Sequence, residues 1–250
     1  MMKVSTLFFL LHYLLVGQTG YEIARQVYQK SNPEDLSNTM HMQLISTKNK
    51  IRSHVMKSKS IDGNRKQMIW FLEPKDDKGV SFLKIEHIGK DDEMKMWLPA
   101  FKKIRRITSK KKSDAFMGSD LSYEDLSSRV LDNNKYERLE DQILDGKDHF
   151  VIEISPKRKV SSAYEKHLSW VDKKTFNIVK EISYDLKGKI YKEKEFVYTQ
   201  IKKYDLIKEV YVKNIQKNHS TRIKFTDIML NQNLGEDLFK EKNLKRIPFD

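Results

Sequence analysis

The sequence predicts a mainly β fold, an antiparallel meander of strands joined by short turns. Apolar and polar residues alternate with a period of two along much of the chain, as in residues 39–44 (Thr-Met-His-Met-Gln-Leu). Residue combinations typical of hairpin turns separate the alternating runs, at residues 62–64, 145–147 and 186–188. Regular helical patterns between the runs are missing, which argues against a parallel sheet built from alternating strands and helices.

The N-terminus has the order of residues found in secretory signal peptides. Lys3 is followed by a mostly apolar run from Val4 to Val16 and then by small and polar residues at 17–20. This run is shorter than the roughly 20 residues that span a bilayer. We therefore predict that residues 1–20 are a signal peptide and that residues 21–250 form a single domain. A buried N-terminal helix is the alternative, because the cleavage region lacks an A-x-A pattern.

The cysteine content and the net charge limit where the protein can be located and which partners it can bind. The chain has no cysteine, whereas a bacterial lipoprotein carries its lipid on a cysteine directly after the signal. We therefore expect cleavage to release a soluble periplasmic protein. The net charge of +13 attracts polyanions. For an exported protein these are anionic lipid headgroups or acidic proteins, and we expect no nucleic acid partner.

The predicted elements of the mature chain begin with a short helix. Residues 21–30 place Ile23, Ala24 and Val27 on one face, and the helix should end before Asn32-Pro33. After this helix the period changes to two. The strands that we expect cover residues 39–44, 67–72, 80–88, 94–98, 150–154, 168–172, 179–186, 190–198, 207–212 and 221–228.

Residues 102–129 interrupt the alternation. Lys110-Lys111-Lys112-Ser113 has the composition of a polar loop, and Ser122 precedes Asp125 by three residues, a spacing typical of a helix N-cap. We expect a short helix or an ordered loop here, inserted between two sets of strands.

The sequence gives no support for catalysis. Its seven histidines are scattered, without a pair at metal-ligand spacing. It also lacks a G-x-S-x-G elbow, a cysteine nucleophile, a phosphate loop and a dinucleotide fingerprint. We expect no enzymatic activity, no metal and no cofactor. A hydrolase would need groups that only the fold brings together.

The most specific stretch is W-L-P-A-F-K-K-I-R-R-I at residues 97–107, followed by F-M-G-S-D-L-S-Y-E-D-L at residues 116–126. It resembles the signature of the outer-membrane lipoprotein-sorting family, which is related to the LolA carriers. The likeness covers roughly residues 36–246. Shorter matches occur in the expected order at residues 71–74, 79–83, 168–172 and 188–189.

The resemblance implies a strongly curved antiparallel sheet, an incomplete barrel covered by a few helices, whose concave apolar side accepts acyl chains. Affinity then comes from removing methylene groups from water, at about 0.8 kcal/mol each. The implied partners are lipid or lipoprotein acyl chains, an inner-membrane transporter and an anionic membrane surface. The alternative is a non-carrier accessory of a lipid exporter or envelope assembly complex. An open apolar cavity would favour the carrier. A sheet face filled by the protein's own side chains would favour the docking module.

The candidate ligand-binding residues are apolar. The methionine pairs at 40/42 and 94/96 each lie on one strand face, and methionine is flexible enough to fit chains of several shapes. Ordinary core packing is the other explanation for these residues. The residues that we expect in the cavity wall are Met40, Met42, Leu44, Met94, Met96, Leu98 and Phe101.

Two further groups belong to the candidate site. We interpret Arg105 and Arg106 as contacts to an anionic membrane or an acidic partner, with a solvated edge strand as the alternative. The second group is the signature loop, in which we expect the polar residues and Gly118 to fix the backbone rather than touch ligand. Its residues are Phe116, Met117, Gly118, Ser119, Asp120, Tyr123, Glu124 and Asp125.

Overall fold

The structure is a computed structural model that describes residues 17–246, which contain one α-helix, α1 (Gly20–Tyr28), and fourteen strands. The strands are β1 (Asp35–Ile45), β2 (Ile51–Ile61), β3 (Lys66–Glu73), β4 (Ser81–Ile85), β5 (Glu93–Leu98), β6 (Lys103–Ile107), β7 (Asn134–Arg138), β8 (Gln142–Leu144), β9 (Lys147–Pro156), β10 (Lys166–Asp172), β11 (Ile178–Tyr184), β12 (Ile190–Ile201), β13 (Tyr204–Asn214) and β14 (His219–Leu230). Six short 3-10 helices complete the described part: η1 (Pro99–Phe101), η2 (Ser109–Lys111), η3 (Glu124–Leu126), η4 (Leu131–Asn133), η5 (Glu236–Phe239) and η6 (Glu241–Lys245).

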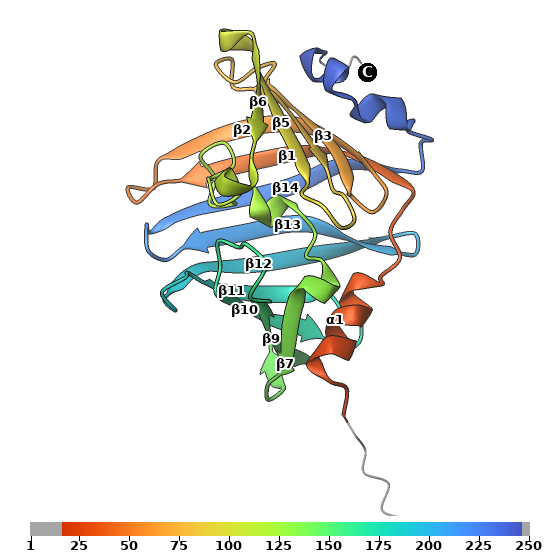
Figure 1. Cartoon of the computed structure of the whole chain (residues 1–250), viewed down its shortest axis with the longest axis vertical. Helices are drawn as coiled ribbons and strands as arrows, with labels where there is room; N and C mark the ends of the chain where they lie inside the picture. Colours follow the sequence, from red (N-terminus) through yellow and green to blue (C-terminus); the bar gives the residue numbers. More distant parts are fainter. Residues whose placement is uncertain (1–16, 247–250) are drawn as a thin grey trace, which may run out of the picture.

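All the strands join one antiparallel sheet (Figure 1). Its order is β6-β5-β4-β3-β2-β1-β14-β13-β12-β11-β10-β9-β7, and β8 pairs with β9. The strands β1 to β6 lead from the middle of the sheet to one edge, and β7 to β14 lead back from the other edge. The chain must therefore pass from one edge to the other between β6 and β7. Residues 108–133 do this across the front of the sheet in Figure 1, and we call them the crossing segment.

The predicted mainly β, antiparallel meander is confirmed. The predicted strong curvature is wrong, because the sheet is neither closed nor strongly curled. The expected few helices are reduced, in the described part of the chain, to α1 and single 3-10 turns. The crossing segment and α1 occupy the space in front of the sheet, and closure would remove that space (Figure 1).

Helix α1 begins with a capping box. The Thr19 hydroxyl accepts a hydrogen bond from the Glu22 N–H, and the Glu22 carboxylate accepts one from the Thr19 N–H at 2.8 Å. A side chain at Gly20 would come within 2.8 Å of the Glu137 backbone, so only glycine allows this close approach to β7. The helix packs Ile23 on β9 and β10. Residues 1–16 of the predicted signal peptide lie outside the described residues.

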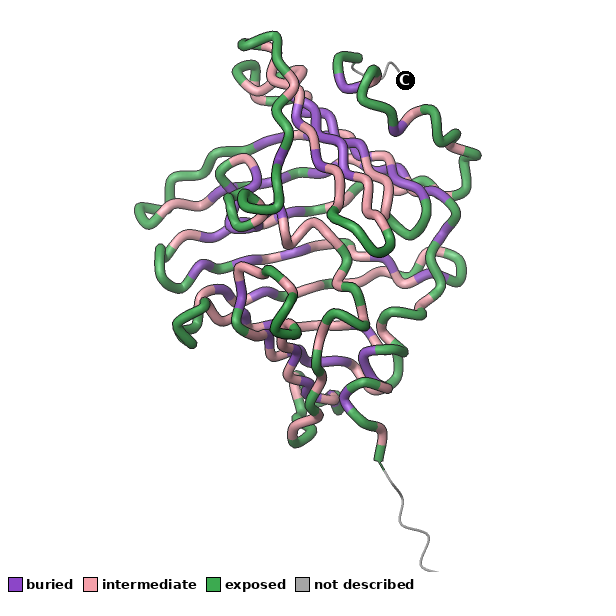
Figure 2. The backbone as a smooth tube through the Cα atoms, in the orientation of Figure 1, coloured by how far each residue is buried: buried purple, intermediate pink, exposed green. Residues whose placement is uncertain are grey.

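Three apolar clusters hold the sheet and its covers together, and Figure 2 shows that burial is concentrated in the strands. The largest lies on the front face of β1 to β6, β13 and β14 under the crossing segment. A second lies on the opposite face of β3 and β4, because Met68 and Trp70 alternate with Ile69 and Phe71, and it is covered by Phe239 of η5. The third lies under α1.

Candidate functional site

The signature residues form a tight turn within the crossing segment. The Phe116 N–H donates to the Leu121 carbonyl at 2.8 Å, and the Ser119 N–H donates to the Phe116 carbonyl at 2.9 Å. Met117 and Gly118 have positive φ angles of 48° and 77°, which allow the chain to reverse here. The turn presents Phe116 and Leu121 to the sheet.

The apolar side of this turn covers the methionine-lined face of the sheet. Phe116, Leu121 and Tyr123 are all buried in the large front cluster. The Phe116 ring lies 5.3 Å from the Phe82 ring and 5.9 Å from the Tyr123 ring, both edge to face. Edge-to-face pairs at these distances add about 0.5–1.5 kcal/mol beyond the burial of the rings. The segment is therefore packed as core, although it has no regular secondary structure over most of its length.

The structure brings together six of the seven residues that we predicted in a cavity wall. Leu98 is half-buried and packs against the large front cluster. The other five are buried in that cluster: Met40, Met42, Leu44, Met94 and Met96. Together with the side chains of the crossing segment in the same cluster, they form packed core. Phe101 is not brought to this face, since 70% of it is exposed. The reason is local, because β5 ends at Leu98 and Pro99 begins the 3-10 turn η1 at the hairpin tip.

The signature's polar residues anchor the crossing segment at several points. The Asp120 carboxylate accepts hydrogen bonds from the Thr221 hydroxyl at 2.7 Å, and it lies 2.7 Å from His219 Nδ1. The Glu124 carboxylate accepts from the Ser162 hydroxyl at 2.5 Å and from the Ala163 N–H at 2.7 Å. These contacts tie the segment to β14 and to the loop between β9 and β10.

Ser122 and Asp125 make the reciprocal contacts that their spacing predicts. The Asp125 N–H donates to the Ser122 hydroxyl at 3.2 Å, and the Ser122 N–H donates to the Asp125 carboxylate at 2.8 Å. The helix that follows is a single 3-10 turn, η3, rather than an α-helix. The Ser119 hydroxyl accepts from the Leu121 N–H at 3.2 Å and so also holds the local backbone.

Charged side chains buried beneath Asp125 form the most unusual feature of the site. Asp125 lies 2.6 Å from Lys194 Nζ and 3.0 Å from Lys192 Nζ, and all three side chains are 3–4% exposed. Lys194 also contacts Glu181 at 3.1 Å. Arg129 binds the Glu181 carboxylate with two nitrogens, at 2.6 and 2.8 Å. We call Asp125, Arg129, Glu181, Lys192 and Lys194 the buried ion cluster, in which Arg129 is partly exposed, with 34% of its side chain accessible.

The cluster's cations control the ionisation of its carboxylates. Burial by itself would raise the pKa of the Asp125 carboxyl, but Lys194 and Lys192 hold that pKa well below its ordinary value. Burial is likewise outweighed at Glu181, where Arg129 and Lys194 hold the pKa well below the usual range. Burial lowers the pKa of Lys192. Three cations and two carboxylates leave the cluster with a net charge of +1.

His167 adjoins the cluster as a neutral side chain. Its Nδ1 lies 2.8 Å from the Ser183 hydroxyl and 3.4 Å from a Glu181 oxygen, and only 3% of the residue is exposed. Burial, together with the positive charge of Arg129, lowers the pKa of His167 to about 3. A second proton here would add to an already positive cluster.

Sequence reasoning missed most of this cluster. It singled out Asp125 as part of the signature, but not Arg129, Glu181, Lys192 or Lys194. Residues 191–195 of β12 read Tyr-Lys-Glu-Lys-Glu, with charges at every position from 192 to 195. Such a run indicates a solvated strand, and no alternation reveals that one face is buried. Residues 17–246 contain no group of three or more metal-ligating side chains close enough to hold an ion.

Arg105 and Arg106 lie on the edge strand β6, and both are exposed. Because successive residues of a strand point to opposite faces, the two arginines do not share one face of the sheet. Arg105 pairs with Met96 and Arg106 with Lys95 across to β5. The fold therefore does not combine the two arginines into a single contact patch.

Comparison with known proteins gives the family. A family model described as an uncharacterized protein matches residues 63–246. The chain is 33% identical to a "putative outer membrane lipoprotein-sorting protein domain" from Vibrio parahaemolyticus, over 91% of this chain and 98% of that one, with a TM-score of 0.85. The chain belongs to the outer-membrane lipoprotein-sorting family. Among curated proteins, none matches it.

Two further structures have a similar fold. A DUF1329 family protein from Desulfovibrio piger is 26% identical, over 90% of this chain and 97% of that one, with a TM-score of 0.86. A LolA superfamily protein from Nitrosomonas europaea is 15% identical, over 90% of this chain and 99% of that one, with a TM-score of 0.72. The fold is therefore LolA-like. Within the described residues, no helix is long and apolar enough to cross a membrane.

Proposed function

We propose that this lipoprotein-sorting family member is a periplasmic carrier or binder of lipid or lipoprotein acyl chains, and that the methionine-lined front face binds them. The observation that carries the proposal is the composition of this face, where five methionines lie together under a cover without regular structure: Met40, Met42, Met56, Met94 and Met96. Methionine side chains adapt to ligands of varied shape. The name of the Vibrio relative supports the same class of cargo.

The estimated energies allow an acyl chain to replace the side chains of the crossing segment on this face. An acyl chain of about 14 methylenes gains about 11 kcal/mol on leaving water, at about 0.8 kcal/mol per methylene. Phe116, Leu121 and Tyr123 now occupy the face, and burial of each contributes about 1.5–3 kcal/mol. Three such side chains together contribute about 5–9 kcal/mol, which is similar to the gain from one acyl chain. A chain can therefore replace them without being held irreversibly.

Positive charge at the neighbouring sheet edge belongs to the same proposal. Arg105 and Arg106 are exposed on β6, beside the apolar face. We propose that this edge contacts an anionic membrane or an acidic surface of a partner such as an inner-membrane transporter. Each arginine then acts from its own side of the strand.

A docking module is the second candidate, and one observation favours it. The front face is filled by side chains of the chain itself, with Phe116 only 1% exposed and Met42 fully buried. A filled face suits an accessory of a lipid exporter or envelope assembly complex that binds proteins and needs no lipid site.

Lipid capture separates the two candidates. Native mass spectrometry of protein purified from the periplasm should show a co-purified acyl lipid, and a fluorescent fatty acid should bind. Phe116→Ala should bind the probe more tightly, because the crossing segment then competes less for the face. Phe239→Ala is the matched control, since Phe239 is 2% exposed in the cluster on the opposite face. If no lipid co-purifies and neither the parent nor Phe116→Ala binds the probe, the docking module is the better account.

A further inference from the structure

Four turns follow one another along one end of the sheet. The strand register brings Ile45 opposite Ser220, Asn214 opposite His219, and Tyr184 opposite Ile190. The β9–β10 pairing places His167 opposite Ile154 at the same end. We call these turns the basic rim; they comprise residues 46–50, 157–160, 185–189 and 215–218.

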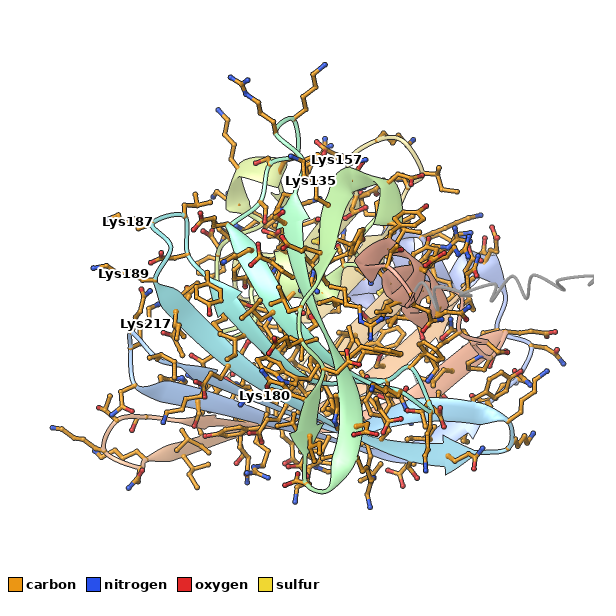
Figure 3. The ribbon with its side chains drawn as sticks, turned by 90° about the horizontal axis from the view of Figure 1, so that it is seen from below. Lys135, Lys157, Lys180, Lys187, Lys189 and Lys217 are labelled. Carbon is orange, nitrogen blue, oxygen red and sulfur yellow. The ribbon has the colours of Figure 1, made fainter. Side chains whose placement is uncertain are left out.

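The basic rim concentrates unpaired positive charge. It holds eight cationic residues and one carboxylate, and the carboxylate of Glu165 lies beside Gly188, so the local net charge is +6. The rim's own carboxylate, Asp185, accepts hydrogen bonds from the N–H groups of Lys187 and Lys189 and from Gln216. None of the eight cations forms an ion pair with another residue in the described range 17–246; they are Lys48, Lys50, Lys157, Arg158, Lys159, Lys187, Lys189 and Lys217. Figure 3 shows Lys187, Lys189 and Lys217 along one edge, pointing outward, and Lys157 farther along, beside Lys135.

The opposite end of the sheet is organised differently. Arg65 is paired with Asp62 at 2.8 Å, and Lys173 is paired with Asp141 at 2.8 Å. Cations at that end are therefore partly neutralised by carboxylates of the same protein. At the basic rim all eight cations are exposed, and their charge remains available to an external partner.

Exposed aliphatic side chains accompany these cations. Leu186 is 70% exposed between Tyr184 and Lys187, and Ile190 and Ile215 are 40% and 38% exposed in or beside the same turns. A cleft of about 170 Å³ lies between the first and last turns, with hydrogen-bonding groups from Ser46, Asn49, Lys213, Asn218 and His219 among its lining. Lysines beside protruding aliphatic residues suit a lipid surface, where the charges meet headgroups and the apolar tips enter the interface.

We propose that the basic rim docks the protein on an anionic phospholipid membrane, end-on. Each surface lysine contributes about fivefold to such binding. This surface is separate from the methionine-lined face, so membrane docking and acyl-chain binding can fail independently. A docked protein would hold its sheet roughly upright on the membrane, with the front face near the bilayer surface at one end.

Vesicle binding of two matched variants tests the proposal. Lys187→Gln with Lys189→Gln alters the turn at one end of β12, and Lys202→Gln with Lys203→Gln alters the turn at its other end. The two pairs change the net charge equally. They lie about 40 Å apart, from the 12 residues of β12 at about 3.3 Å each, which exceeds a Debye length of about 10 Å. Binding is measured by co-sedimentation with vesicles of phosphatidylglycerol and phosphatidylcholine, and with phosphatidylcholine alone.

The parent should bind the anionic vesicles and not the neutral ones. The rim pair should weaken binding about thirtyfold at low salt, and the control pair less than threefold. Leu186→Ser should weaken the binding that persists at high salt. Equal losses by the two pairs would assign the attraction to overall charge and overturn the proposal. The proposal would also be overturned if the parent protein bound neither kind of vesicle. That result would indicate an acidic protein partner.

Discussion

Replacing Asp125 by Asn tests whether the buried ion cluster holds the crossing segment on the sheet. The substitution keeps the side chain's size and removes its charge. Lys194 then keeps one carboxylate, Glu181, which Arg129 already binds with two nitrogens. Lys192 loses its carboxylate and keeps its contact with the Tyr164 hydroxyl, at 2.7 Å. The cluster's net charge rises from +1 to +2 in a site where the lysine side chains are 3–4% exposed.

Removal of one partner from a buried ion pair typically destabilises a protein by about 3–5 kcal/mol. That is a large part of the roughly 5–15 kcal/mol by which a domain is stable. For a domain of this size the melting temperature should fall by about 6–20 °C. Urea unfolding followed by tryptophan fluorescence measures the free energy directly.

A second variant separates charge from packing. Lys192→Met removes the cation whose pKa burial lowers, and by itself it should change stability little, because the cluster's net charge falls from +1 to zero and Asp125 keeps Lys194 as a partner. Combined with Asp125→Asn it should recover about 1–2 kcal/mol, since the net charge returns to +1. A loss below about 1 kcal/mol for Asp125→Asn, or no recovery in the double variant, would show that the cluster does not hold the segment electrostatically.

Further predictions follow from other parts of the structure. The pKa of His167 is lowered to about 3 in the folded protein, so the unfolded state binds a proton first as the pH falls. Between pH 7.5 and 5 the free energy of unfolding of the parent should therefore fall by about 2 kcal/mol, measured by urea unfolding, and that of His167→Gln should not show this loss. Met96→Asn should destabilise the fold by about 1–3 kcal/mol or more, because Met96 is 4% exposed in a packed cluster; an unchanged melting temperature would indicate an open cavity instead. Arg105→Gln with Arg106→Gln should weaken binding to anionic vesicles in a salt-dependent way, and equal binding at low salt would assign the pair a structural role. We expect the exported protein to start at or before Thr19, at least two residues ahead of the boundary predicted from sequence, because Thr19 caps α1; N-terminal sequencing can establish this.

The meander could be predicted because its strands alternate apolar and polar residues. Strand β2 shows where this signal fails. Its buried positions include His54, Ser58 and Ser60 as well as Met56, so its sequence does not alternate in polarity although its burial does. His54 is accommodated by Asp77, 3.1 Å from its Nε2. Local pattern cannot predict a buried polar face whose partners lie far away in sequence.

The path of the crossing segment could not be predicted either. From sequence, residues 102–129 had the properties of a loop between two sets of strands. Only the sheet order, with β6 and β7 at opposite edges, requires the segment to cross a whole face. Its anchors are correspondingly remote, since Asp120 meets Thr221 and Asp125 meets Lys192 and Lys194.

The two halves of the signature carry different interactions. Its first half places Phe116 and Leu121 on an apolar face, where an acyl chain offers equivalent contacts. Its second half places Asp125 among buried lysines, where an acyl chain offers none. In the proposed function, an acyl chain would replace the contacts of Phe116, Leu121 and Tyr123, while Asp120 and Asp125 would keep their polar contacts to β14 and β12. Gly118, with a φ of 77°, lies where the first half turns back, and the Leu44 side chain lies 3.6 Å from the position that its Cβ would take. The buried ions would then keep the segment attached to the sheet while the apolar face exchanges its contacts with the proposed ligand.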